Sequence, residues 1–342
     1  MKKLLLALFL SVTWNHFLWA QTPYYQGKTM TIVVGTVAGD VYDLYARAIA
    51  LTLGKYLPGN PNIIVQNMPG AGHMIAANYL YGVAKPDGLT IGGTLPTLYF
   101  EQLIGRAEVK FDWTKFSWIG NATKSPQVLY MRADAPYKTM DDVRNAKEPP
   151  KCGTTGTSNM GYFVPKLLSE TIGAKFNVIA GYRGGSEVDL AVEKGEIQCR
   201  SLSAEAFFSR EPFHTWRKKG FVRVLAQGGK QRDERLPDAP TIYEFLDKYK
   251  TPELGRRLTT ALLAGGEFHR PYIGPPNLRP ENVKLLREAF ASVMKDPDFL
   301  TEAKKKRLDI DPTSGAEVEV LVKEVMNQPK DVIERLKVLM GR

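Results

Sequence analysis

The sequence predicts an α/β protein with two αβ domains, a central cleft and a hinge. Segments typical of strands alternate with segments typical of helices, which indicates parallel sheets covered by helices. A chain of 342 residues is long enough for two domains with separate cores. One αβ set, 127–225, interrupts another, so we expect 21–126 and 226–342 to form domain 1 and 127–225 to form domain 2. A cleft is expected where the carboxyl ends of the strands in the two domains face each other.

The first αβ set contains three predicted strands separated by amphipathic segments. The turn "KPDGLT" separates the second helix from the third strand by ordinary Pro-Asp-Gly turn chemistry. We expect strands near 29–35, 62–66 and 89–94, and helices near 40–57 and 73–84.

The second set begins near Gln127, and Thr139 and Asp142 have the spacing of a capping box before a short helix. A Pro-rich stretch at 271–280 follows this set, and two or three charged amphipathic helices are expected after it. We expect the strands of the second set near 150–153, 176–181, 196–201 and 222–229, and its helices near 160–172 and 185–194.

The first twenty residues have the pattern of a signal peptide. Lys2 and Lys3 precede the apolar run 4–12, and Ala20 ends an imperfect cleavage site. The apolar run is shorter than the roughly 20 residues that a membrane span needs. We therefore expect residues 1–20 to be removed and the mature protein to be exported and soluble.

The chain carries a formal charge of +10, which falls to +8 (10 − 2) without Lys2 and Lys3. A basic surface suits an anionic solute, but it also suits nucleic acid or anionic lipid. The two short basic clusters, 217–219 and 304–307, are typical of solvated helix ends. The interleaving of aromatic and basic residues found in single-strand binding grooves is absent, so we expect no nucleic-acid partner.

Cys152 and Cys199 are the only cysteines. An even count in an exported protein favours a disulfide, and two buried free thiols are the alternative. The usual catalytic and metal-binding motifs are absent, since His73, His214 and His269 have neither HExxH nor Cys/His spacing. We therefore expect no enzyme activity, no metal and no cofactor.

Four junctions between a predicted strand and a predicted helix are rich in glycine and other small residues: 35–39, 69–72, 153–158 and 181–186. Free backbone N–H groups and the positive end of a helix dipole attract carboxylate or phosphate at such a junction. A single junction is weak support, because glycine also serves tight turns. Three or four charge-assisted hydrogen bonds of about 1.5–3 kcal/mol each are enough for micromolar binding, which is what a receptor needs.

Five stretches resemble, in order and spacing, the extracytoplasmic receptors of tripartite tricarboxylate transporters, also called the Bug family: "KTMTIVVGTVAGDVYDLYARAIA", "VQNMPGAGHMIAANYLYGVAKPDGLTI", "CGTTGTSNMGY", "GYRGGSEVDLAVEKGEI" and "LPDAPTIYEF". The resemblance covers essentially the whole mature chain. It implies a monomeric periplasmic binding protein of the type II class. Such a receptor closes on a small organic acid and delivers it to a transporter with one large and one small membrane subunit.

The resemblance also implies a set of ligand-binding residues in the glycine-rich loops and on the helix that follows the last loop. In the family, backbone amides of these loops and ordered waters hold the carboxylate groups. The matching positions are Thr36, Ala38 and Gly39 in the first loop, Gly70, Ala71 and Gly72 in the second, Thr155, Gly156, Thr157 and Ser158 in the third, Tyr182, Arg183 and Gly184 in the fourth, and Asp189 on the helix.

The chain departs from the family pattern at four positions. Asp40 replaces the second glycine of a Gly-Gly pair, Gly35 replaces a proline, His73 replaces a glycine and Arg183 replaces a lysine. Asp40 is expected either to cap the helix and point away from the ligand or to pair with an ammonium or hydroxyl group on it. Arg183 is expected either to bind a carboxylate through two hydrogen bonds or to lie on the surface or between the domains.

Asp189 is likewise expected either to contact the ligand or to lie on the helix surface.

Two other functions stay open beside the transport receptor. One is an input protein for a membrane sensor kinase, which would use the same site. The other is a small-molecule hydrolase or lyase on the same frame, in which turnover would replace stoichiometric binding.

Overall fold

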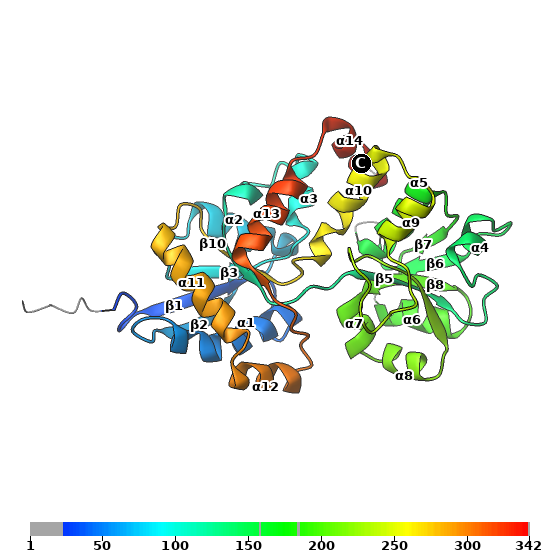
Figure 1. Ribbon diagram of the computed structural model, residues 1–342. Helices are drawn as coiled ribbons and strands as arrows, with labels where there is room; N and C mark the ends of the chain where they lie inside the picture. The colour runs from blue at the N-terminus through cyan, green and yellow to red at the C-terminus, as the bar shows by residue number, and fades with distance from the viewer. Residues whose placement is uncertain (1–22, 157–158, 183–184, 341–342) are drawn as a thin grey trace, which may run out of the picture.

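The computed structural model describes residues 23–156, 159–182 and 185–340, and it contains two lobes that are each built around one sheet (Figure 1). The predicted signal peptide, residues 1–20, lies outside the described residues. The first lobe holds a six-stranded sheet in the order β11-β4-β10-β3-β1-β2. Its strands are β1 (Thr29–Val34), β2 (Asn62–Asn67), β3 (Thr90–Gly93), β4 (Ser117–Asn121), β10 (Pro271–Gly274) and β11 (Thr313–Ser314).

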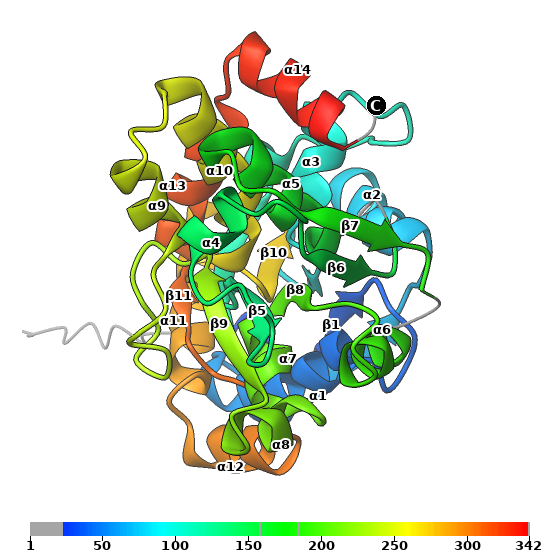
Figure 2. The same ribbon diagram turned by 90° about the vertical axis from the view of Figure 1, so that its right-hand side faces the viewer.

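The second lobe holds a five-stranded sheet in the order β7-β6-β8-β5-β9. Figure 2 looks at the molecule from the side of this lobe. Its strands are β5 (Gln127–Arg132), β6 (Lys151–Thr154), β7 (Asn177–Ala180), β8 (Cys199–Ser203) and β9 (Val222–Gln227).

Helices follow most strands, and caps mark where several of them begin. The capping box predicted at Thr139 and Asp142 is confirmed at the start of α4. No helix within the described ranges is both long and apolar enough to span a bilayer. The helices are α1 (Val41–Leu53), α2 (Met74–Gly82), α3 (Leu98–Leu103), α4 (Met140–Arg144), α5 (Met160–Ile172), α6 (Gly185–Glu193), α7 (Ala204–Ser209), α8 (Phe213–Lys218), α9 (Ile242–Lys248), α10 (Glu253–Leu263), α11 (Pro280–Val293), α12 (Pro297–Lys305), α13 (Gly315–Met326) and α14 (Lys330–Leu339), with short 3₁₀ turns η1 (Gly54–Tyr56), η2 (Ala71–His73), η3 (Trp113–Lys115) and η4 (Ala264–Gly266).

The fold class is confirmed, but the sheets are mixed rather than parallel throughout. β1 is parallel to β2 and β3, whereas β10 is antiparallel to β3 and β4. In the second sheet β6 is parallel to β7 and β8, whereas β5 is antiparallel to β8 and β9. β5 and β10 enter their sheets directly from the boundary between the lobes, so they run opposite to strands that end there.

The central strands are buried on both faces. Val33 packs into one hydrophobic cluster with α2 and α13, whereas its neighbours Ile32 and Val34 pack into another with α1, α11 and α12. This alternation follows from the two-residue repeat of a strand. It explains why the segment reads as a continuous apolar run, as parallel strands covered on both faces do.

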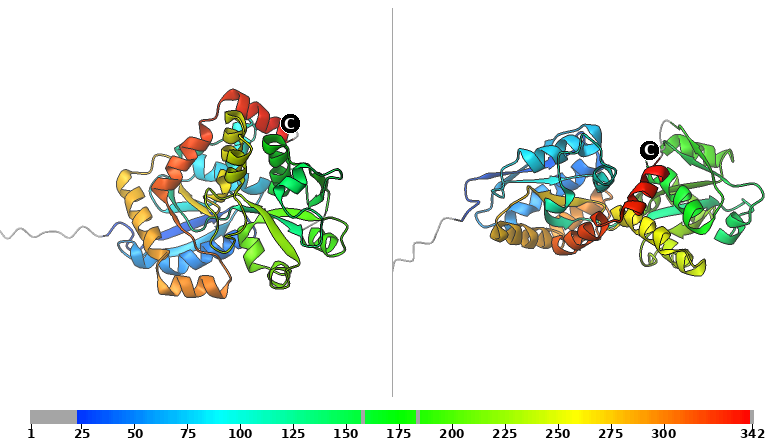
Figure 3. Two further views of the ribbon diagram at one scale, coloured as in Figure 1. Left: turned by 45° about the vertical axis from the view of Figure 1, so that its right-hand side comes forward. Right: turned by 90° about the horizontal axis from the view of Figure 1, so that it is seen from above.

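The lobes are joined by the crossing segment, residues 122–126, which connects β4 to β5. Ser125 N–H donates to Gly266 O (2.8 Å), and Pro126 O accepts from Ala204 N–H (2.8 Å), so the segment is bonded on both sides. Helices α9, α10 and α14 lie beside α5. Seen from above, α14, in red, lies between the two lobes (Figure 3). The bounds 21–126 with 226–342 and 127–225 stay our proposal for the two domains.

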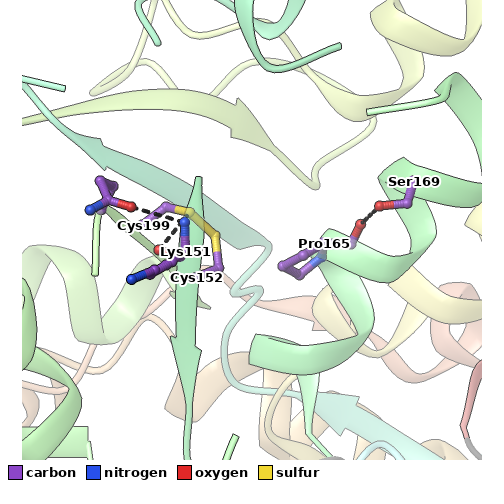
Figure 4. Close-up of a disulfide and its surroundings, with 6 residues drawn as sticks. Lys151, Cys152, Pro165, Ser169 and Cys199 are labelled. Carbon is purple, nitrogen blue, oxygen red and sulfur yellow. Dashed lines mark hydrogen bonds between the residues drawn. A yellow bond between two sulfur atoms is a disulfide. The ribbon is translucent and has the colours of Figure 1, made fainter. Parts of the chain in front are cut away.

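The predicted disulfide is confirmed between Cys152 of β6 and Cys199 of β8 (Figure 4). The two cysteines are direct partners in the parallel register, and their Cα atoms lie 4.4 Å apart. Both are fully buried. The bond therefore fastens two central strands of the second sheet beneath the loops that follow them.

Removing this bond is expected to lower the free energy of unfolding by about 4 kcal/mol, since it closes a loop with a sequence separation of 47 residues. The test is urea unfolding of the wild-type protein and a Cys152→Ala/Cys199→Ala variant. A reductant should shift the midpoint of the wild type and leave that of the variant in place. Equal midpoints for the oxidised wild type and the variant would contradict the prediction.

Candidate functional site

The first glycine-rich loop connects β1 to α1, and Asp40 ends it as the N-cap of the helix. Asp40 Oδ1 accepts a hydrogen bond from Tyr42 N–H (3.0 Å). Ala38 and Gly39 are exposed, and Thr36 is half-buried. The capping geometry is the first of the two roles expected for Asp40, and aspartate fills it well.

Asp43, in the first turn of α1, occupies part of the site that the sequence assigned to a ligand. Its Oδ2 accepts from Gly39 N–H (2.8 Å), so this N–H group is already engaged. Burial opposes ionisation of Asp43, but hydrogen bonds from Arg47, Gly39 and Asn67 outweigh it and hold the pKa of the carboxyl below its usual range. Asn67 also donates to Thr36 O (3.0 Å), which joins this loop to the end of β2.

The second loop, which connects β2 to α2, has four consecutive residues with positive φ. They are Gly70 (140°), Ala71 (45°), Gly72 (60°) and His73 (68°). Side chains rarely adopt this region, so Ala71 and His73 carry backbone strain. The loop is therefore held in an unusual shape, with Ala71 and Gly72 exposed.

His73 fills the space beneath the first loop. A Cβ atom on Gly35 would lie 2.5 Å from His73 Cγ, closer than two such atoms can approach. The imidazole also contacts the Tyr42 ring edge-on, with 4.6 Å between centroids. Burial, aided by Arg270 and opposed by Asp40, lowers the pKa of His73 to about 4, so the ring is neutral near pH 7. The departures from the family pattern at positions 35 and 73 are thus sterically matched.

The third loop connects β6 to α5 in the second lobe. Asn159 donates to Thr155 Oγ1 (3.0 Å) and accepts through Oδ1 from the Thr154 hydroxyl (2.7 Å), which also lies 3.3 Å from Gly156 O. Thr157 and Ser158 lie outside the described residues. The described part of the loop lines a pocket of about 230 Å³, the polar pocket below, whose walls are Gln127, Thr154, Thr155, Asn159, Met160, Gly161, Arg200, Ser201, Leu202 and Ser203.

Asp189 is buried rather than on a helix surface, and its carboxylate pairs with Arg200. Arg200 also donates to Gly185 O (3.0 Å). Asp189 therefore holds the side chain of Arg200, a residue that lines the polar pocket. Tyr182 lines a separate hollow of the second lobe, and Arg183 and Gly184 lie outside the described residues.

A buried ion pair joins the two lobes behind these loops. Arg270, just before β10, donates to Glu205 of α7 (2.6 Å between Nη2 and Oε2), and both side chains are 5% exposed. His269 Nε2 lies 3.4 Å from the same oxygen. Burial opposes ionisation of Glu205, but contacts with His269 and Arg270 outweigh it and lower the pKa of the carboxyl.

In the first lobe the structure brings loops 36–40 and 70–72 together through Gly35 and His73. In the second lobe Thr155 and Arg200 line the polar pocket, whereas Tyr182 lines a separate hollow. Arg200, Glu205 and Arg270 were not predicted as site residues from the sequence. Arg200 directly follows Cys199, one of the two cysteines noted in the sequence. This is the only local signal that points to Arg200. Within the described ranges, no three His, Cys, Asp or Glu side chains form a metal-binding group.

Comparisons with known proteins agree with this architecture. The model of a family described as "Tripartite tricarboxylate transporter family receptor" matches residues 45–338. A UPF0065 protein from the gbd 5′ region of Cupriavidus necator is 26% identical over 324 residues, which cover 93% of this chain and 90% of that protein.

Two solved structures are similar in fold. One is a TctC solute binding protein from Polaromonas, with a TM-score of 0.72 and 22% identity over 93% of this chain and 99% of that one. The other is an R. palustris protein with adipate, with a TM-score of 0.60 and 18% identity over 92% of this chain and 98% of that one.

The contact between Gly35 and His73 predicts a strong coupling between the two positions. Gly35→Ala is expected to destabilise the wild-type protein by about 1–3 kcal/mol through overpacking. In a His73→Gly background the same change should cost less than about 0.5 kcal/mol, because the space is then free. Urea unfolding of the four chains measures the coupling.

Gly82→Ala at the end of α2 is the control for this experiment, since nothing lies within 4 Å of the added atom. It should be tolerated in both backgrounds. An equal cost of Gly35→Ala with and without His73 would show that the two residues do not compete for space.

Glu205→Gln is expected to lower the free energy of unfolding at pH 7 by about 3 kcal/mol or more, because it leaves Arg270 charged and buried. Since the pKa of Glu205 is lowered by folding, its contribution is present above the unfolded carboxyl range, near pH 4.5, and is lost as the pH falls through the folded value. The difference between wild type and variant should therefore shrink in acid.

Chemical denaturation from pH 7 down to pH 3 checks this dependence. Glu334→Gln is the matched control, because Glu334 pairs with Lys337 on the surface with a side chain 68% exposed. Such a pair contributes about 0–1 kcal/mol. If Glu205→Gln lowers the free energy of unfolding as little as the control does, the buried pair is not needed for stability.

Proposed function

The chain belongs to the tripartite tricarboxylate transporter family of receptors, and from this membership we propose that it captures a small carboxylate between its two lobes. Members of the family are solute-binding receptors rather than enzymes, and the same holds for this chain.

The observation that supports the proposal is that each lobe carries a group of glycine-rich loops. Each group lies where strands end and helices begin, so backbone N–H groups and helix dipoles favour an anion there. The first lobe contributes Thr36, Ala38 and the turn 70–72, whereas the second contributes Thr155, Gly156 and the cation of Arg200. Gly39 is a weaker candidate than the sequence suggests, since Asp43 accepts from its N–H group.

Four predicted residues, Thr157, Ser158, Arg183 and Gly184, keep their assignment as ligand-binding residues only as predictions. Asp189 acts through Arg200 in this proposal, and Asp40 acts as a cap. Tyr182 is assigned a contact that forms only when the lobes close. A closed state of this kind is stabilised by the ligand through its greater affinity for that state.

We place the mature protein in the periplasm as a monomer, after removal of residues 1–20. There it would deliver its ligand to a membrane transporter made of one large and one small subunit. The R. palustris structure with adipate supports a carboxylate as the class of ligand, since that protein has the same fold. No cofactor or nucleic acid takes part in this function.

Carboxylates are expected to bind stoichiometrically without turnover. Isothermal titration with mono-, di- and tricarboxylates should give at least one ligand with an affinity in the micromolar range, about −8 kcal/mol. The corresponding amides are matched neutral ligands and should bind at least about tenfold more weakly, because each charge-assisted hydrogen bond contributes about 1.5–3 kcal/mol. Equal binding of an acid and its amide, or formation of product, would contradict the proposal.

The cation of the polar pocket is tested by Asp189→Asn/Arg200→Gln, which removes both charges and so leaves no unpaired buried ion. This variant should lose about tenfold or more in affinity for the carboxylate. Arg256→Gln on α10 is the control, since Arg256 pairs with an exposed Asp247 outside both loop groups. Unchanged binding by the double variant would remove Arg200 from the site.

A further inference from the structure

An apolar cavity adjoins the polar pocket at the boundary between the lobes. It has a volume of about 290 Å³. Its walls come from the segment after β3 (Leu95 and Phe100), from α5 (Met160 and Phe163) and from the end of α10 (Leu263). We call it the apolar cavity.

The two spaces share one wall. Gln127, Asn159 and Met160 line both the apolar cavity and the polar pocket. Gln127 Oε1 is buried there without a hydrogen-bond partner among the described residues. The two spaces are thus neighbours, one polar and one apolar, and a ligand that reaches both once these shared side chains move would have a polar end and an apolar body.

The distribution of charge indicates which end of such a ligand lies in which of the two spaces. Arg200 lines the polar pocket, and its guanidinium is paired with Asp189. In the described part of the chain no lysine or arginine lines the apolar cavity, whereas the acidic residue Glu101 does. His269 lies in the cavity wall as a neutral ring, because burial lowers its pKa to about 4. A carboxylate is thus favoured at one end only, since a second one would be desolvated without a cation.

The volume sets the size of the apolar body. A dry cavity of about 150 Å³ lined by aliphatic and aromatic side chains binds benzene. The apolar cavity is about twice as large, so it has room for a substituted ring or a chain of several carbons. A pocket with apolar walls and a few polar groups at one end is the usual form of a small-molecule site.

We propose that the apolar cavity is the subsite for the hydrocarbon body of a monocarboxylate whose acid group lies in the polar pocket, near Thr155 and Arg200. This inference rests on the proposed function and narrows its ligand class. It separates the ligand of this chain from small dicarboxylates, whose second acid group has no partner in the apolar cavity.

The test is isothermal titration of the dialysed full-length mature protein with acetate, butanoate, hexanoate and octanoate, and with adipate as a partner to hexanoate. Hexanoate and adipate have the same number of carbons and differ in the second acid group. Affinity should rise about fourfold for each methylene until the cavity is full. Hexanoate should bind at least tenfold more tightly than adipate.

Leu95→Asn is expected to weaken hexanoate about tenfold more than it weakens acetate, because it places an amide in the wall of the cavity. Met340→Ser changes the same cavity wall near the end of the chain and should also weaken hexanoate more than acetate. The variant is expected to fold, because the Met340 side chain is only half-buried. Leu254→Asn on the exposed side of α10 should change neither affinity, as its side chain is 40% exposed.

Each outcome is decisive. A rise along the chain series with hexanoate above adipate supports the inference. If carboxylates bind but affinity is flat along the series, or adipate equals or exceeds hexanoate, the subsite is wrong and the proposed function stands. If no carboxylate of the full panel binds, the proposed function fails and the inference falls with it.

Discussion

Glu205 of the second lobe and Arg270 of the first meet where both side chains are almost completely buried, and each would be an uncompensated buried charge without the other. Their pairing requires α7 and the start of β10 to stay together. The crossing segment reinforces this contact, because Ser125 accepts from Glu205 N–H (2.9 Å) and donates to Gly266 O. The Glu205–Arg270 pair therefore holds the two lobes together by charge at their boundary.

A second set of buried interactions shapes the loops themselves. Asp43 binds the first loop through Gly39, and Asn67 binds it through Thr36. His73 then fills the space beneath Gly35. These contacts engage some of the hydrogen-bonding groups of the loops, whereas Ala38 and Ala71 lie at exposed positions. What remains for a ligand is thus a subset selected by the packing beneath it.

The polar and the apolar walls of the proposed ligand site belong to two neighbouring spaces. Arg200 is held by Asp189 and supplies the cation on the second lobe, whereas the neighbouring cavity is lined by Leu95, Phe100 and Phe163. A receptor of this kind would recognise the two ends of its ligand through two different kinds of interaction. Charge and hydrogen bonds orient the acid group, and burial of hydrocarbon adds affinity in proportion to its area.

Local pattern was enough to predict β1, β2 and β6, the cap at Thr139, and a disulfide between the only two cysteines. Strand β10 and the direction of β5 were not predictable, because both depend on where the chain re-enters a sheet. The sequence by itself determined the α/β class and the glycine-rich turns, since these depend on neighbouring residues. Only the tertiary structure decided that Gly35 matches His73 and that Glu205 meets Arg270, 65 positions away, because such contacts depend on distances between segments that are remote in the chain.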